Sequence, residues 1–300
     1  MKDRLGVPTL LGIRFDGESS YLRGAGDAPA KIRTALLSDA SNMWTELGLD
    51  LGSPGAFEDA GDLEFVEHHA SRAVGGHLRG SPDRQEPGQP AVEKIFAAIE
   101  GRVGSLIAAG KRPVLLGGDH SITFPIVKAF GSNSPGRPSP QGGLTIFHFD
   151  AHPDLYDEFE GDRLSHACPF ARIMEGRLAK RLVAVGIRTA TRHQREQAAR
   201  FGVEMVEMRA LPAYDKLTAD GPIYLTFDMD VLDPGFAPGV SHREPGGMSV
   251  REAIAHLHAI NGEIVGADLV EYNPVQDFGG TTATVAAKIL KEILGRMING

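Results

Sequence analysis

Strand-length apolar runs alternate with segments of helical periodicity along most of the chain, and this alternation constrains the fold more than any other feature. We expect strands at residues 7–13, 112–118, 143–150, 181–187, 222–230 and 263–270. Amphipathic stretches predict helices at about 29–37, 90–109 and 283–297, and others from about Thr123 and after Met248. Helices in the connections allow the strands to run parallel, with helices on both faces of the sheet. The pattern predicts an α/β fold that binds ligands at the carboxyl ends of its strands.

Local signals refine this outline. Ser249 and Glu252 have the spacing of a capping box, which predicts the start of the helix after Met248. Two segments rich in Gly, Pro and Ser, 76–90 and 131–143, have no change of composition across them. They are typical of surface loops rather than of linkers between domains. We therefore expect one domain over residues 1–300.

Charge and cysteine usage exclude several functional classes. The net charge of −8, from 39 acidic and 31 basic residues, argues against nucleic-acid binding and suits a cationic partner. No run of 18 apolar residues is present, and the N-terminal segment lacks the cleavage site of a signal peptide, so we expect no membrane association. The single cysteine, Cys168, cannot form an intramolecular disulfide. These features are typical of a cytoplasmic protein.

Acidic and imidazole side chains gather where three of the expected strands end. They lie in GGDHS (117–121), FDAHPD (149–154) and FDMDVLDP (227–234), and they are His120, Asp150, His152, Asp154, Asp228 and Asp230. Alternate residues of an extended segment point the same way, so D-x-H-x-D and D-x-D can each direct their side chains to one centre. An isolated Asp–His pair is usually a cap or a turn, but three motifs at three strand ends favour a shared site.

The residue types indicate which ligand that site would hold. Four carboxylates packed together repel one another unless cations lie between them. Carboxylate oxygens mixed with imidazole nitrogens suit Mn²⁺, or another borderline divalent ion, better than Ca²⁺ or a thiolate-bound Zn²⁺. Two such ions roughly 3.5 Å apart can lower the pKa of a shared water and supply hydroxide near neutral pH. The sequence therefore predicts a binuclear metal site with hydrolytic chemistry.

These motifs resemble the signatures of the arginase–agmatinase ureohydrolases. The resemblance extends from GVP and DAGDL (59–63) to the last helix. The segments 152–176, 239–252 and 270–277 look like the plant-type arginase branch. The resemblance implies a three-layer α/β/α domain around a mainly parallel eight-stranded sheet, assembled as a homotrimer or homohexamer.

By position, the resemblance also implies two Mn²⁺ ions per subunit, with Ni²⁺ or Co²⁺ as alternatives. One ion would be held by His120, Asp150, Asp154 and Asp228. The other would be held by Asp150, His152, Asp228 and Asp230. Asp150 and Asp228 would then bridge the two ions.

Further residues gain expected roles from the same resemblance. His166, in SHACPF, matches the loop histidine that shuttles protons to the leaving amine. Glu271 matches the glutamate that binds the guanidinium through paired charge-assisted hydrogen bonds. His242 falls where most family members have a threonine near the substrate. The plant-type branch shares this histidine, which could contact the guanidinium or a catalytic water.

Three neighbouring polar residues are expected to play supporting parts. Asp119 and Asp233 are interpreted as residues that orient ligands or form turns. Cys168 is interpreted as a packed thiol rather than a nucleophile, because no base motif accompanies it.

The activity implied by the resemblance is hydrolysis of a small cationic guanidino substrate with release of urea. Likeness to plant-type arginases favours L-arginine, cleaved to ornithine, and so a place in arginine metabolism. The alternative is agmatine, cleaved to putrescine in polyamine metabolism; other guanidino acids, or guanidine with Ni²⁺, are more distant. Specificity depends on whether a cation meets the substrate carboxylate, and the candidates are Arg163, Arg172 and Arg243.

Two other classes of protein are alternatives to a ureohydrolase. The first is an acid-rich binding protein of the same fold without turnover, which would not need to keep every ligand together with His166 and Glu271. The second is a metallohydrolase that acts on amides or phosphates, which would not require Glu271.

Overall fold

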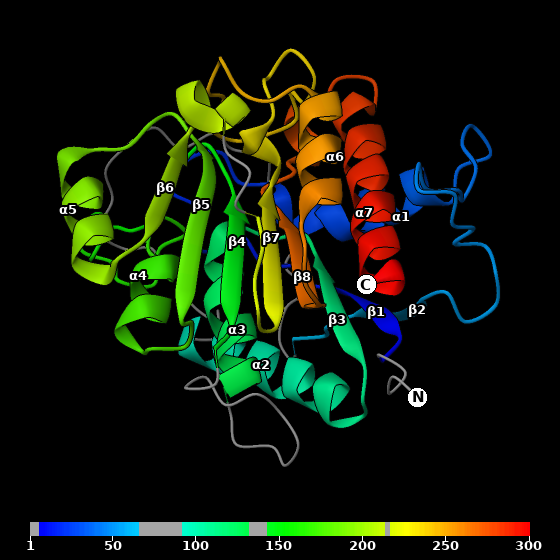
Figure 1. Ribbon diagram of the computed structural model, residues 1–300, viewed down its shortest axis with the longest axis horizontal. Coiled ribbons are helices and arrows are strands. Elements are labelled where there is room, and N and C mark those ends of the chain that lie inside the picture. Colours follow the sequence, from blue (N-terminus) through cyan, green and yellow to red (C-terminus); the bar gives the residue numbers. More distant parts are fainter. Residues whose placement is uncertain (1–5, 66–91, 132–142, 214–216) are drawn as a thin grey trace.

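The computed structural model describes residues 6–65, 92–131, 143–213 and 217–300. In these residues, strands form one eight-stranded sheet in the order β2-β1-β3-β8-β7-β4-β5-β6, and every neighbouring pair is parallel. The strands are β1 (Pro8–Gly12), β2 (Glu58–Asp62), β3 (Arg112–Leu116), β4 (Thr145–Phe149), β5 (Arg181–Ile187), β6 (Glu204–Glu207), β7 (Ile223–Asp228) and β8 (Ile264–Val270). Because the sheet is parallel, all carboxyl ends meet at one edge, toward the top of Figure 1.

Helices cover both faces of the sheet, as the resemblance implied (Figure 1). One face packs against α1 (Ala28–Leu36), α6 (Val250–Ala259) and α7 (Thr281–Asn299). The other packs against α2 (Val92–Ala108), α3 (Thr123–Gly131), α4 (Pro169–Glu175) and α5 (Arg192–Phe201). The alternation within β3 illustrates the two cores, since Val114 and Leu116 join the first and Leu115 joins the second. The predicted three-layer α/β/α fold is confirmed.

The predicted central strands and the first, second and last helices appear within a few residues of their expected bounds. The capping box is also present, with Ser249 Oγ accepting from the backbone of Glu252 at 3.2 Å and Glu252 Oε2 accepting from the backbone of Ser249 at 2.8 Å. In the described residues, no helix is long and apolar enough to cross a membrane. Residues 76–90 and 132–142, where surface loops are expected, lie outside the described residues.

Four elements were missed by the sequence analysis. The strands β2 and β6 lie at the two edges of the sheet and have few buried residues, so they lack the apolar runs of the central strands. In α5, only Gln194, Gln197 and Ala198 are buried, which hides its helical pattern. The short α4 begins at Pro169, directly after the loop that contains His166.

Two glycines shape the chain where β3 ends. Gly117 has a φ of 78° and Gly118 a φ of 87°, both in the left-handed region. A Cβ atom on Gly118 would lie 2.5 Å from the carbonyl oxygen of Phe15, and one on Gly117 would lie 2.5 Å from Pro29 Cδ. The predicted strand over 112–118 therefore ends at Leu116, and the turn that follows leads the chain to His120.

Candidate metal centre and substrate site

The six predicted metal ligands lie at the carboxyl edge of the central strands. His120 begins the 3-10 turn after β3, Asp150 follows β4, and Asp228 is the last residue of β7. The strands β4 and β7 are neighbours, and β8 separates β7 from β3. The remaining ligands, His152, Asp154 and Asp230, lie in the turns just after β4 and β7. Motifs that are far apart in the sequence thus converge on one place in the fold.

The first group of donors surrounds the Nδ1 atom of His120. This atom lies 3.1 Å from Asp150 Oδ2, 3.1 Å from Asp154 Oδ2 and 3.2 Å from Asp228 Oδ2. It is buried, and among the described residues none of its contacts has the geometry of a hydrogen bond. Donors at right angles, each about 2.1 Å from one ion, lie about 3 Å apart, so these spacings fit a coordination sphere. His120 Nε2 lies 2.9 Å from Thr226 Oγ1, which fixes the ring.

The second group adjoins the first through Asp150. His152 Nδ1 lies 3.0 Å from Asp230 Oδ2 and 3.4 Å from Asp150 Oδ1. Asp150 therefore directs one oxygen to each group, as a bridging carboxylate would. Asp228 differs, because its second oxygen accepts a hydrogen bond of 2.8 Å from the backbone of Asp230. Its part in a second metal site is less direct than that of Asp150.

His148 belongs to the cluster, and the sequence analysis missed it. It is fully buried in β4, its Nε2 lies 2.7 Å from Asp150 Oδ2, and its ring stacks on Phe170 at a centroid distance of 3.9 Å. The available signal was its position two residues before Asp150, on the same face of the strand. Its contact with Asp150 suits a residue that orients a ligand.

The electrostatics of the cluster favour bound cations. Burial, together with repulsion from Asp230 and Asp150, raises the pKa of Asp228 well above its ordinary value. Burial and the charge of Asp150 likewise raise the pKa of Asp230 to about 6. Burial also acts to raise the pKa of Asp150, but His148 and His120 hold it well below the ordinary value. Carboxylates this close in a dry site are unfavourable by themselves, and positive ions between them would remove that cost.

Next to the carboxylates, His166 and Glu271 form a buried pair. His166 Nδ1 lies 3.0 Å from Glu271 Oε1, and the same oxygen accepts a hydrogen bond of 2.9 Å from the backbone of His120. Burial acts to lower the pKa of His166, but the hydrogen bond and charge of Glu271 raise it to about 9. Glu271, the predicted guanidinium anchor, thus contacts both the predicted proton shuttle and the backbone of a predicted metal ligand.

His242 lies between this pair and the second donor group. Its ring stacks on His166 at 5.4 Å and meets that of His152 edge-on at 5.9 Å. Burial lowers its pKa. A neutral ring in this position suits the predicted contact with a guanidinium or a water.

Backbone strain also concentrates at the site. Asp154 has a φ of 48° and Glu271 a φ of 61°, values that side chains other than glycine rarely adopt. Such conformations cost about 1 kcal/mol or more and persist where surrounding contacts determine them. Both residues carry carboxylates that the sequence analysis assigned to function.

The three arginines named as partners for a substrate carboxylate are engaged elsewhere. Arg163 pairs with Asp157 at 2.7 Å, and Arg172 pairs with the same carboxylate at 2.9 Å. Arg243 donates to the carbonyl of Pro238 at 2.9 Å and lies 3.3 Å from the side-chain oxygen of Gln276. Each guanidinium already has partners within the described residues.

The supporting residues lie as follows. Asp119 is buried and accepts hydrogen bonds from Ser121 and from the backbone of Glu18, and Asp233 accepts from the backbones of Gly235 and Gly246. Cys168 is fully buried, and burial raises the pKa of its thiol to about 12, which does not suit a nucleophile.

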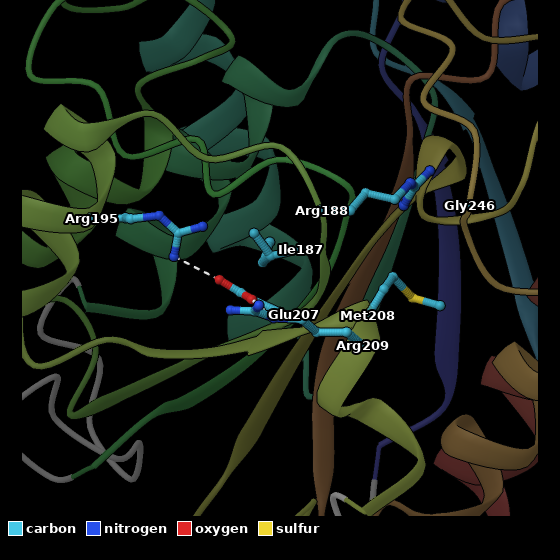
Figure 2. Close-up of a pocket in the computed structure, with 7 residues that line it drawn as sticks. All are labelled: Ile187, Arg188, Arg195, Glu207, Met208, Arg209 and Gly246. Carbon is cyan, nitrogen blue, oxygen red and sulfur yellow. Dashed lines mark hydrogen bonds and ion pairs between the residues drawn. The ribbon is translucent and has the colours of Figure 1, made fainter.

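A pocket of about 600 Å³ lies beside this site and is separate from the predicted ligands (Figure 2). Arg195 and Glu207 form an ion pair on its wall, and Arg188 extends toward Gly246. Arg188 donates to the carbonyl of Asp230 at 2.5 Å and to that of Glu244 at 2.6 Å. It therefore holds the loop after β7 against the end of β5.

A parallel sheet with buried carboxylates and imidazoles at its carboxyl edge is typical of an α/β protein with a metal centre. Comparison with known proteins narrows this class, because residues 8–295 match the model of the arginase family. The chain belongs to the arginase family and is a metal-dependent ureohydrolase. Its buried His and Asp clusters are consistent with the family's binuclear metal site.

Individual relatives support this assignment. The chain is 41% identical to the mitochondrial arginase of Medicago truncatula over 96% of this chain and 81% of that protein. It is 32% identical to the agmatinase of Bacillus subtilis over 95% of this chain and 90% of the relative. The solved arginase of Medicago truncatula matches with a TM-score of 0.83 and 40% identity, covering 98% of this chain and 88% of that one. Since this relative is named as mitochondrial, the cytoplasmic location expected from the sequence stays a prediction.

Proposed function

We propose that the protein is an arginase, a single-domain enzyme that hydrolyses L-arginine to ornithine and urea with two Mn²⁺ ions per subunit. The observation that carries the proposal is the group of donors around His120 Nδ1, which we call the cage. Three carboxylate oxygens lie within 3.2 Å of this nitrogen, and the backbone of His120 donates to Glu271. Identity of 41% to a plant arginase, against 32% to an agmatinase, favours arginine as the substrate.

The proposed ligand sets follow the two groups of donors. One ion would be held by His120, Asp150, Asp154 and Asp228, and the other by Asp150, His152, Asp228 and Asp230. When bound, a pair of divalent cations lowers the pKa of a water shared between them and so supplies a nucleophile near neutral pH. Ni²⁺ or Co²⁺ are the alternative metals.

Residues around the cage would handle the substrate. The carboxylate of Glu271 would accept hydrogen bonds from the planar guanidinium and orient its carbon. His166, in contact with Glu271, would deliver a proton to the nitrogen that leaves. His242 stacks on His166 and would close the space around the guanidinium. A homotrimer or homohexamer is the proposed assembly.

Agmatine is the second candidate substrate, and one observation favours it. Agmatine lacks the carboxylate of arginine, and the guanidinium groups of Arg163, Arg172 and Arg243 already have partners in the protein. A buried substrate carboxylate without a partner would cost several kcal/mol. If arginine is the substrate, neutral hydrogen-bond donors or ordered water must meet its carboxylate.

The test is urea release from L-arginine, agmatine, 4-guanidinobutyrate and guanidine by protein loaded with Mn²⁺, Ni²⁺ or Co²⁺. We expect the highest kcat/KM for L-arginine with Mn²⁺, and two ions per subunit by elemental analysis. A higher kcat/KM for agmatine would replace arginine in the proposal. No urea from any substrate with any of the three metals would refute it.

A further inference from the structure

The His166–Glu271 pair continues to a third residue on the side away from the metal ligands. Ser20 Oγ lies 2.8 Å from His166 Nε2, while His166 Nδ1 lies 3.0 Å from Glu271 Oε1. The imidazole is therefore held at both nitrogens, by a hydroxyl on one side and a carboxylate on the other. Ser20 lies in the segment after β1, 146 residues before His166, and it belongs to none of the motifs discussed above.

The turn that carries Ser20 is fixed to the same site. The carboxylate of Asp119 accepts a hydrogen bond of 2.9 Å from the backbone of Glu18. The carbonyl of Glu18 in turn accepts from the backbone of His166 at 3.3 Å. The residue directly before His120 therefore holds the turn that presents Ser20, and a second hydrogen bond ties that turn to the loop of His166.

Ser20 is in contact with the imidazole and is itself partly exposed. His166 is 9% exposed and Glu271 is 5% exposed, so both are largely shielded from bulk water. Ser20 is partly exposed, and the next residue, Tyr21, is 63% exposed. The serine hydroxyl therefore offers a route for a proton between His166 and solvent.

A hydroxyl is suited to this position in both charge states of the histidine. It can accept from Nε2–H of the imidazolium, and after rotation it can donate to Nε2 of the neutral ring. Nε2 faces Ser20 and Nδ1 faces Glu271, so Nε2 would exchange a proton with Ser20 while Nδ1 would give one up on the side of the proposed guanidinium anchor. As the hydroxyl gives its proton to Nε2, it can take one from water, and the charge on the serine does not change.

We propose that Ser20 is a positioning residue for His166, which holds its imidazole at Nε2 and connects it to solvent for proton exchange. This role rests on the proposed function of His166 as a proton donor. It concerns residues that are not among the proposed metal ligands, so it can be tested with and without bound metal.

The central variant is Ser20→Ala, and Ser20→Thr keeps a hydroxyl as the conservative counterpart. Ser19→Ala is the matched control, because Ser19 lies in the same turn and its hydroxyl contacts Asp119 rather than His166. We expect Ser20→Ala to lower kcat about tenfold with KM and metal content unchanged. Ser20→Thr should recover most of kcat, and Ser19→Ala should keep the wild-type pH profile.

The second readout is the pKa of His166 in metal-free protein, measured by NMR with labelled histidine and assigned by the signal lost in His166→Ala. A hydroxyl stabilises the imidazolium more than the neutral ring, because hydrogen bonds from charged donors are stronger. We therefore expect Ser20→Ala to lower the pKa of His166 and Ser19→Ala to leave it unchanged.

Two results would overturn the proposal. One is a Ser20→Ala enzyme with kcat within twofold of wild type and an unchanged pKa of His166. The other is an equal loss of kcat and of melting temperature in all three variants, which would assign the turn a structural role alone. If the wild-type protein releases no urea, the proposed function fails, while the NMR measurement still decides whether Ser20 holds His166.

Discussion

Replacement of Arg188 by alanine tests how the two loops at the edge of the metal centre are held together. Its guanidinium donates to three carbonyl oxygens at 3.2 Å or less, those of Asp230, Val231 and Glu244. Arg188→Ala leaves these oxygens without their charged donor. At about 1 kcal/mol for each lost bond, we expect the free energy of unfolding to fall by about 3 kcal/mol.

The structure also predicts a consequence for metal binding. Asp230 offers its carboxylate to the second donor group, and its carbonyl is one of those held by Arg188. Release of this carbonyl should loosen the carboxylate and lower metal affinity about tenfold or more, as changes beside ligands commonly do.

Urea-induced unfolding of metal-free protein measures the first effect, and titration with Mn²⁺ measures the second. Metal-free protein is needed because bound ions add their own stabilisation. Arg192→Ala is the matched control, since Arg192 lies near the same end of β5 and pairs only with exposed Glu196 among the contacts of the described residues. A loss below 1 kcal/mol in Arg188→Ala, or an equal loss in Arg192→Ala, would refute the reasoning.

Three further predictions follow from the same contacts. His120→Ala should lower metal content and activity together, because it removes the nitrogen at the centre of the first donor group; elemental analysis with a urea assay would detect retained metal. His166→Ala should lower kcat about 100-fold with both metals bound, and metal loss in that variant would contradict its role. Burial acts to raise the pKa of Glu292, but Lys288 and His258 lower it below 4.5. The stabilisation from this carboxylate is therefore present above pH 4.5 and disappears as the pH falls further. In acid unfolding experiments, the free energy of unfolding should fall more below pH 4.5 in wild type than in Glu292→Gln.

The central part of the fold could be predicted because its sequence signals are local. Strands buried on both faces appear as continuous apolar runs, as in β3, β4 and β7, whose residues are all buried. The edge strand β2, with the sequence EDAGD, is held instead by backbone pairing to β1. Backbone pairing leaves no apolar pattern in the side chains, so composition and periodicity could not find this strand.

The same distinction separates the site residues that were predicted from those that were missed. Asp150 and Asp228 stand in short motifs at strand ends, where the spacing alone indicates a shared centre. The roles of His148, beside Asp150, and of Ser20, beside His166, depend on contacts between side chains that lie on different elements or far apart in the sequence. Ser20 meets His166 only because Asp119 fixes one turn and two loops pack together, and no property of a nearby sequence window encodes that contact.

One backbone amide links the proposed metal site to the proposed guanidinium anchor. The amide of His120 donates to Glu271 Oε1, the oxygen that also contacts His166. Glu271 reaches this position through a left-handed backbone, and its own amide donates to the carbonyl of Gly118 at 3.0 Å. The turn that places a metal ligand therefore also sets the proposed guanidinium anchor. A side chain on Gly118, 2.5 Å from the Phe15 carbonyl, should disturb metal affinity and KM together, whereas a change confined to the Ser20 hydroxyl should alter only turnover.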